Sequence, residues 1–267
     1  VGTFTGTLNG GSKTITLATG EKYGYNVTSS STAEGVGQIY RHSYSGLFSV
    51  IGDGTTGTGT VNNITVAGTI NVRNAGADGM SIGGIAARSH GNTTLNAVSV
   101  TGLTINYHEG AASPNSDDLG KNIGGFIGYV DNHSTDNGTI EIKGVSVASP
   151  SIVSTGHHEG WNVSGGAIGK VASTKIIINI GQNSGDKLTV GMTADISGVT
   201  NVGSNSDSGG LIGYIISKGS YTTRTVNINN LEFNNSITNT LIFTVLPIFC
   251  NILSSEHTFK CASPFLL

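Results

Sequence analysis

The sequence predicts an all-β protein, a parallel β-helix of about twelve coils. Two observations lead to this fold class. Gly, Ser, Thr and Asn make up nearly half of the 267 residues, and two short motifs alternate in phase along residues 1–240. Helices disfavour Gly in their interior and Ser, Thr and Asn favour turns and caps, so a helix bundle or coiled coil is excluded. Hydrophobic residues still make up 36%, which is enough for a core.

The first motif is a small residue and Gly followed by two mostly apolar residues. It reads SGLF, GGIA, GGFI, GGAI and GGLI, and its second residue recurs at spacings of 38, 41, 41 and 44. Paired glycines that lead into an apolar strand suit a corner where two backbones approach closely. We therefore expect structural roles for the second residue of each copy, which is Gly46, Gly84, Gly125, Gly166 and Gly210.

The second motif alternates apolar and polar residues, as expected of a half-buried strand. It reads NNITV, NAVSV, KGVSV, DKLTV and NNLEF, ending at Val66, Val100, Val147, Val190 and Phe233. Together the motifs divide each repeat of about 41 residues into halves of about 20, too short for a four-stranded blade and without a helix for a βαβ unit. We expect each half to form one coil, which gives a rod of about 55 Å at about 4.8 Å per coil. The competing fold is an antiparallel sandwich, whose turns need not stay in phase over five copies.

These motifs resemble the GLUG-type repeats of secreted and surface β-helix proteins. GGFIGY (124–129) and GGLIGY (209–214) carry the resemblance best, and the opening FTGTLNGGSKTITL (4–17) is similar to the family's entry segment. SGLFSV and GGIAAR depart from it, because Ser49 and Ala87 stand where the family has a further Gly. The resemblance implies a right-handed, pectin-lyase-like β-helix in an exported adhesin-like protein, and it implies no catalytic residues.

The domain organisation is a repeat domain over residues 1–240 and an off-pattern tail over 241–267. The tail lacks Gly and holds both cysteines, Cys250 and Cys261. It fits a cap over the end of the stack, the truncated start of another domain, or sequence foreign to the repeat. The opening at Val1 is interpreted as a mature or excised fragment.

Charge and hydropathy exclude two classes of partner. The 13 Lys and Arg residues are scattered, so a cationic nucleic-acid interface is not expected. The longest apolar stretch, near residues 241–250, falls short of the roughly 20 residues of a membrane-spanning helix.

Carboxylates are the first candidates for chemistry, because β-helices also host polysaccharide lyases and glycosidases. Asp117, Asp118 and Asp131 lead, followed by Glu109 and Glu159. Glycoside hydrolysis needs two carboxylates about 5–10 Å apart. The alternative for Asp117 and Asp118 is a solvated turn, where Asp is favoured.

Two related tetrapeptides, YHEG (107–110) and HHEG (157–160), offer imidazole and carboxylate ligands for a metal such as Zn²⁺. The candidate ligands are His108, Glu109, His157, His158 and Glu159. The alternative is a pair of homologous polar corners. Trp161, together with Tyr107 and Tyr129, could stack on sugar rings or simply pack at the rim.

The sequence thus favours a non-enzymatic, extracellular or cell-surface module that serves as stalk or recognition surface and needs no cofactor. Its partners would be a host glycan, a surface protein or neighbouring repeats of the parent chain. The alternative is a carbohydrate-active enzyme. A third interpretation, an ice- or crystal-binding solenoid, requires regular Thr-x-Thr on one face, and Thr14-Ile15-Thr16 is the main match.

Overall fold

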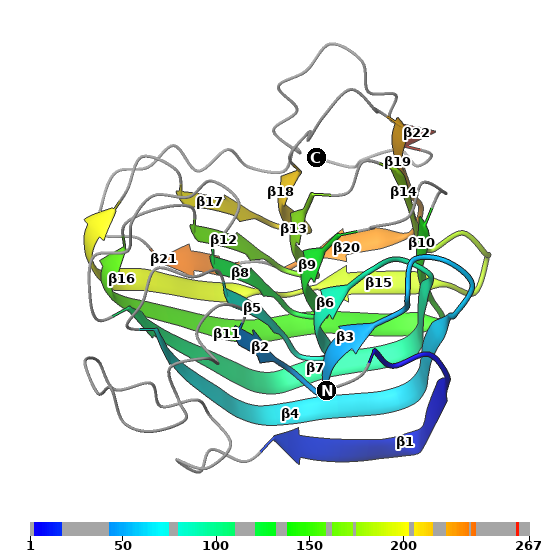
Figure 1. Cartoon of the computed structure of the whole chain (residues 1–267), viewed down its shortest axis with the longest axis horizontal. Helices are drawn as coiled ribbons and strands as arrows, with labels where there is room; N and C mark the ends of the chain where they lie inside the picture. Colours follow the sequence, from blue (N-terminus) through cyan, green and yellow to red (C-terminus); the bar gives the residue numbers. More distant parts are fainter. Residues whose placement is uncertain are drawn as a thin grey trace.

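The computed structural model consists of parallel β-strands (Figure 1). It describes residues 3–17, 43–74, 80–109, 121–131, 138–158, 162–172, 175–202, 206–215, 223–234, 236–238 and 260–261, and none of these is helical. All the strand pairs within this part of the chain are parallel, which confirms the all-β, parallel prediction and excludes the antiparallel sandwich for these residues.

The strands form three sheets. The first short sheet contains β2 (Ser43–Ser45), β5 (Met80–Gly83), β8 (Lys121–Gly124), β12 (Asn162–Gly165) and β17 (Ser206–Gly209). The second short sheet contains β3 (Phe48–Ile51), β6 (Ala86–Ser89), β9 (Ile127–Val130), β13 (Ile168–Val171) and β18 (Ile212–Ile215). Each strand of the second sheet follows a strand of the first, and the glycine motif lies between them.

The third, long sheet has two limbs. Its short limb contains β10 (Gly138–Lys143), β14 (Lys175–Ile180), β19 (Thr223–Ile228) and β22 (Lys260–Cys261). Its long limb contains β11 (Val145–His158), β15 (Lys187–Val190), β16 (Thr193–Val202), β20 (Leu231–Phe233) and β21 (Ser236–Thr238). The remaining strands, β1 (Thr7–Leu17), β4 (Gly59–Asn74) and β7 (Thr93–Glu109), continue through both limbs.

The repeating structural unit is the whole repeat, not its half. Gly83 pairs with Gly124, Gly124 with Gly165, and Gly165 with Gly209, so neighbouring strands lie 41 to 44 residues apart in sequence. The expected coil of about 20 residues, and with it the expected twelve coils and the rod length, is therefore wrong. The physical reason is that the two motifs belong to different sheets: the glycine motif joins the short sheets, whereas the alternating motif lies in the long sheet.

The paired glycines lie at a junction without room for side chains. A Cβ added at Gly166 would lie 2.1 Å from the Gly210 carbonyl oxygen and 2.2 Å from Cγ1 of Val190. At Gly125 the same atom would lie 2.2 Å from the Gly166 carbonyl oxygen. The junction therefore packs directly on the backbone of the next repeat and on the inward side chains of the long sheet.

The alternating motif holds in four of its five copies. Val66 pairs with Val100, and Val190 pairs with Phe233. In the KGVSV copy, however, Ala148 and not Val147 pairs with both Val100 and Val190. The copy is shifted by one residue, and because side chains alternate between faces the shift turns Val145 and Val147 outward and Ser146 inward. Val145 is 65% exposed and Ser146 is fully buried.

Inward side chains of all three sheets form one hydrophobic core, in which Ile and Val predominate. No helix in the described residues is long and apolar enough to span a membrane. The described part of the tail is β22, where Lys260 and Cys261 pair with Asn227 and Ile228. Cys250 lies outside the described residues.

Candidate functional site

The two His-Glu-Gly segments end neighbouring strands but are not aligned. His108 pairs with Thr155 and Glu109 with Gly156, whereas His157 and His158 lie further along β11 and pair with Asn201 and Val202. The segments are therefore offset by three residues, because His108 pairs with Thr155 and not with the equivalent His158. Glu159 lies outside the described residues. Within the part of the chain that the structure describes, no group of three or more His, Cys, Asp or Glu residues is placed to hold a metal ion.

The structure places some of the candidate ligand-binding residues and leaves others outside the described part of the chain. Tyr107 is 1% exposed and belongs to the hydrophobic core, so its ring is not a surface platform. The sequence suggested exposure because Tyr107 directly precedes a polar tripeptide, yet it continues the inward alternation of Leu103 and Ile105. Trp161, Asp117 and Asp118 lie outside the described residues.

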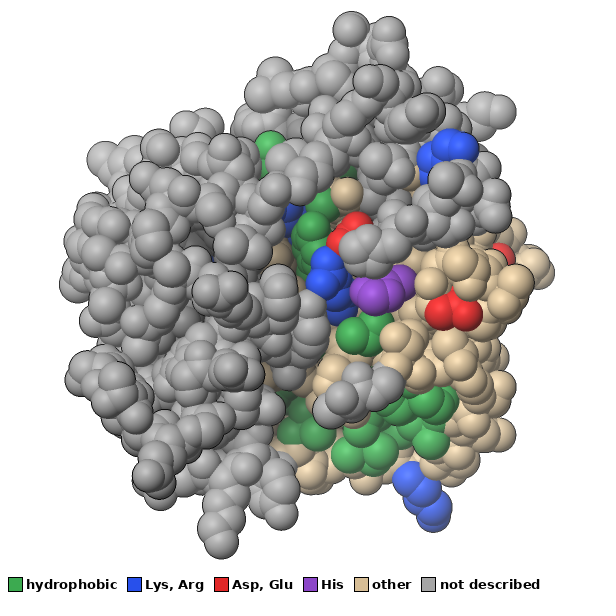
Figure 2. Space-filling model, in the orientation of Figure 1, with side chains coloured by type: hydrophobic (Ala, Val, Ile, Leu, Met, Phe, Trp, Pro, Cys, Tyr) green, Lys and Arg blue, Asp and Glu red, His purple; other side chains and the backbone are tan. Residues whose placement is uncertain are grey.

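Asp131 belongs to a polar cluster on the second short sheet. Its carboxylate forms an ion pair with the guanidinium of Arg88, and each of the two side chains is 17% exposed. The Arg88 guanidinium carbon also lies 4.9 Å from the centre of the Tyr129 ring, a cation–π contact. Figure 2 shows basic, acidic and His side chains close together on the face of the molecule that carries β6 and β9.

This cluster is part of a column that crosses four strands. Arg88 pairs with Tyr129, Tyr129 with Lys170, and Lys170 with Tyr214, so cationic and aromatic residues alternate from strand to strand. Sequence reasoning missed Arg88 and Lys170 as members of the column. The signal was available, since each of the four residues follows the second glycine of its motif by four positions.

Three further carboxylates, those of Glu141, Glu232 and Asp53, form contacts within the fold. Glu141 pairs with Lys143, and Glu232 pairs with Lys187. Asp53 accepts hydrogen bonds from the amides of Thr55 and Gly57. These hydrogen bonds, and the bond from Thr55 most of all, hold the pKa of Asp53 below its usual range. The ion pair with Lys187 similarly lowers the pKa of Glu232. The Asp53 contacts stabilise a turn, the Glu232 pair joins β20 to β15, and the Glu141 pair lies along the single strand β10. None of these contacts brings two carboxylates together for glycoside hydrolysis.

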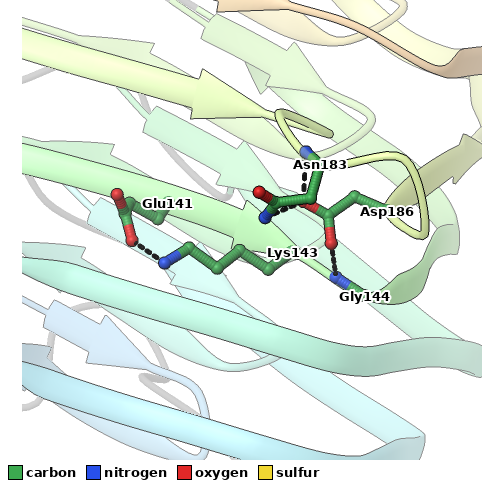
Figure 3. A network of polar contacts seen from close by, with 5 residues as sticks. All are labelled: Glu141, Lys143, Gly144, Asn183 and Asp186. Atoms are coloured by element: carbon green, nitrogen blue, oxygen red, sulfur yellow. Dashed lines mark hydrogen bonds and ion pairs between the residues drawn. The ribbon is translucent and has the colours of Figure 1, made fainter.

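Asp186 stabilises an insertion between the limbs of the long sheet (Figure 3). A single residue, Gly144, joins β10 to β11, whereas six residues separate β14 from β15 in the following repeat. The Asp186 carboxylate accepts bonds from the Gly144 amide at 2.8 Å and from the Asn183 amide and side chain at 2.9 Å each. Burial acts to raise the pKa of Asp186, but these hydrogen bonds outweigh it and the pKa is lowered.

Outward side chains of the long limb form columns that cross the strands. Thr69 pairs with Thr104, Thr104 with Ser151, and Ser151 with Thr193. We call these four residues the hydroxyl column. A parallel column on one side consists of Asn71, Asn106, Val153 and Asp195, and the Asn106 side-chain amide donates to Oδ1 of Asn71 at 2.8 Å.

No protein-family model matches this chain, and no curated protein or solved structure is significantly similar to it. Its role is therefore inferred from its residues and their arrangement.

Proposed function

We propose that the chain is a non-enzymatic recognition and spacer module of an exported, adhesin-like cell-surface protein, built as a right-handed parallel β-helix of GLUG-type repeats. The handedness, the family and the extracellular location rest on the sequence resemblance. The partner is a host glycan or surface protein, or neighbouring repeats of the parent chain.

The observation that carries the proposal is the in-register pairing of successive repeats. Equivalent positions lie on neighbouring strands, as Gly83, Gly124, Gly165 and Gly209 do. A stack in which each repeat contacts only its neighbours extends by adding repeats without changing its cross-section, which suits a spacer. The same register repeats the outward side chains in columns, which suits recognition of an extended partner.

The contacts of the carboxylates favour this proposal over a polysaccharide lyase or glycosidase. Asp131 is paired with Arg88, and Asp186 is used to cap backbone amides. A carboxylate held in such contacts is a poor acid or base unless substrate displaces its partner. Support for a recognition role comes from the neutral side chains of the long limb.

The test is to apply the full chain to a glycan array, with calcium and after EDTA, and to incubate the same preparation with the polysaccharides of the array. We expect selective binding that survives EDTA, without new reducing ends or unsaturated products. Release of either product would overturn the non-enzymatic proposal. A blank array without cleavage would restrict the role of the chain to that of a spacer.

A further inference from the structure

β1 lies at the edge of the long sheet and, among the described strands, pairs with β4 alone (Figure 1). An edge strand offers backbone amides and carbonyls to any other strand that meets it, so it can recruit a second molecule. Proteins guard such edges with charged side chains on the inward face and with bulges that twist the edge out of line. β1 has both of these features.

The first feature is Lys13, which occupies a core position of the edge strand. Lys13 pairs with Ile64, which in turn pairs with Val98, and both of these apolar side chains are buried. Alternation along β1 agrees, since Lys13 shares a face with Ile15 and Leu17, which pack against the hydrophobic core. The side chain of Lys13 is exposed, so its ammonium group keeps contact with water at this end of the stack.

The second feature is a bulge in β1 at the corner between the two limbs. Residues 10–12 stand opposite the single residue Asn63 of β4. Gly11 and Ser12 have left-handed φ angles of 57° and 60°, and the Gly11 amide donates a hydrogen bond to Oδ1 of Asn9 at 3.2 Å. The bulge therefore has a defined shape, and it turns this part of the edge away from a further strand.

From these two features we infer that β1 blocks end-to-end assembly of the molecule, and that the ammonium group of Lys13 is the main barrier to a second copy of this chain. The surface that it keeps away is the opposite end of another molecule, where β20 is the last described strand of its ladder. This inference goes beyond the proposed function and applies whichever partner the outer surface binds.

Without this charge the two ends of the long sheet would match. Ile15 pairs with Val66, the first residue of the column described above that ends at Phe233. Lys13 and Leu231 each lie two residues earlier, so they end the neighbouring inward column. The side chains of Ile15, Leu231 and Phe233 pack against the core and are partly exposed. A second copy that continued the parallel stack would therefore lay one apolar end on the other.

The charge of Lys13 opposes this contact. In the continued stack, Phe233 of one copy would lie on Ile15 of the next, which is favourable. Leu231 would lie on Lys13, and the ammonium group would lose water between two apolar rungs or leave the rung unfilled. A lysine at this position therefore costs little in a single molecule and opposes the assembled state.

The experiment is sedimentation velocity of the full chain over a range of concentrations. We expect the parent chain and Lys13→Arg, which keeps the charge, to sediment as monomers. Lys13→Ile should form oligomers, with a self-association affinity at least about tenfold higher than that of the parent. Lys13→Met, whose side chain is close in shape to lysine, should assemble in the same way and provides a second, independent variant.

The matched control is Thr14→Ile, which adds an isoleucine to the same strand on its outward face. This control should stay monomeric, because it leaves Lys13 in place. Leu231→Lys in the Lys13→Ile chain identifies the contact, since it returns a charge to the same column from the opposite end and should restore the monomer. Thermal unfolding of every variant shows whether it remains folded.

A folded Lys13→Ile or Lys13→Met chain that stays monomeric would overturn this inference. Assembly of the parent chain, or equal assembly of Thr14→Ile, would overturn it as well, because the charge would then not be the barrier. Oligomers of Lys13→Ile that persist when Leu231→Lys is added would show that the ends are not in contact.

Discussion

The amide of Val98 donates a hydrogen bond to the hydroxyl of Ser146, which lies 3.1 Å away in the next repeat. The same hydroxyl donates to the Lys143 carbonyl oxygen at 2.8 Å, and Ser146 is fully buried. It bridges two backbone groups where the chain passes from the short limb to the long limb of the sheet. This contact explains a serine in a core position that the motif reserves for an apolar residue.

The stability of the KGVSV copy should depend on its serine more than on its second valine. Ser146→Ala should lower the free energy of unfolding by about 1–3 kcal/mol, because it leaves a buried amide and carbonyl without this partner. Val147→Ser, on the outer face, should change it by less than about 0.5 kcal/mol. Urea denaturation of both variants measures the difference. A larger loss for Val147→Ser than for Ser146→Ala would contradict the one-residue shift of this copy.

The glycine junction should not tolerate a single added methyl group. Gly166→Ala places a Cβ within 2.2 Å of the Gly210 carbonyl oxygen and Val190 Cγ1, so something must move. We expect a loss of about 3 kcal/mol in the free energy of unfolding. Gly185→Ala is the matched control, because no heavy atom beyond Gly185 and its two chain neighbours lies within 4 Å of the added Cβ. Thermal denaturation of both variants tests the prediction, and similar melting temperatures would contradict it.

Asp186 should make stability depend on pH in the acid range. Its pKa in the folded state lies below its usual value, so its contribution is present above that value and is lost as the pH falls through the folded pKa. At neutral pH, Asp186→Asn should cost about 1–3 kcal/mol, because the amide nitrogen cannot accept the bonds made to the second oxygen. Urea denaturation as a function of pH should show this difference shrinking on acidification. A difference independent of pH would exclude the carboxylate charge as its cause.

The Arg88–Asp131 pair should contribute a measurable coupling energy. Both side chains are 17% exposed, so the pair lies between the surface and buried classes of ion pair. A double-mutant cycle with Arg88→Met and Asp131→Asn should give about 1–2 kcal/mol. The matched pair Lys187–Glu232, whose side chains are 52% and 46% exposed, should couple negligibly. Equal couplings in the two cycles would contradict the dependence on burial.

The sequence located the elements well because each signal was local. Paired glycines predicted the junction of the short sheets, and β-branched alternation predicted strands of the long sheet, as Val66 and Val100 show. The length of the coil is predicted wrongly from the sequence, because a motif does not show which other strand it will pair with. Nothing near Gly124 in sequence indicates that its neighbours in the sheet are Gly83 and Gly165.

The candidate site was harder to predict for the same reason. The sequence marks Asp131 as a candidate carboxylate, but its partner Arg88 is 43 residues away and becomes adjacent only through strand pairing. The hydroxyl column escaped a search for Thr-x-Thr because its members come from four different repeats. The sequence allows sugar stacking or rim packing for Tyr107, because its polar neighbours mask the inward alternation of β7.

By itself, the sequence determined that this chain is built from β-strands, where its corners lie and that its surface carries little charge. These properties follow from conformational freedom at Gly, steric preference at Ile and Val, and composition, all of which act within a few residues. The tertiary structure decided which copies pair, which face each side chain takes and which polar groups meet. These depend on backbone hydrogen bonds between strands about 41 residues apart, and a shift of one residue, as at Ser146, exchanges core for surface.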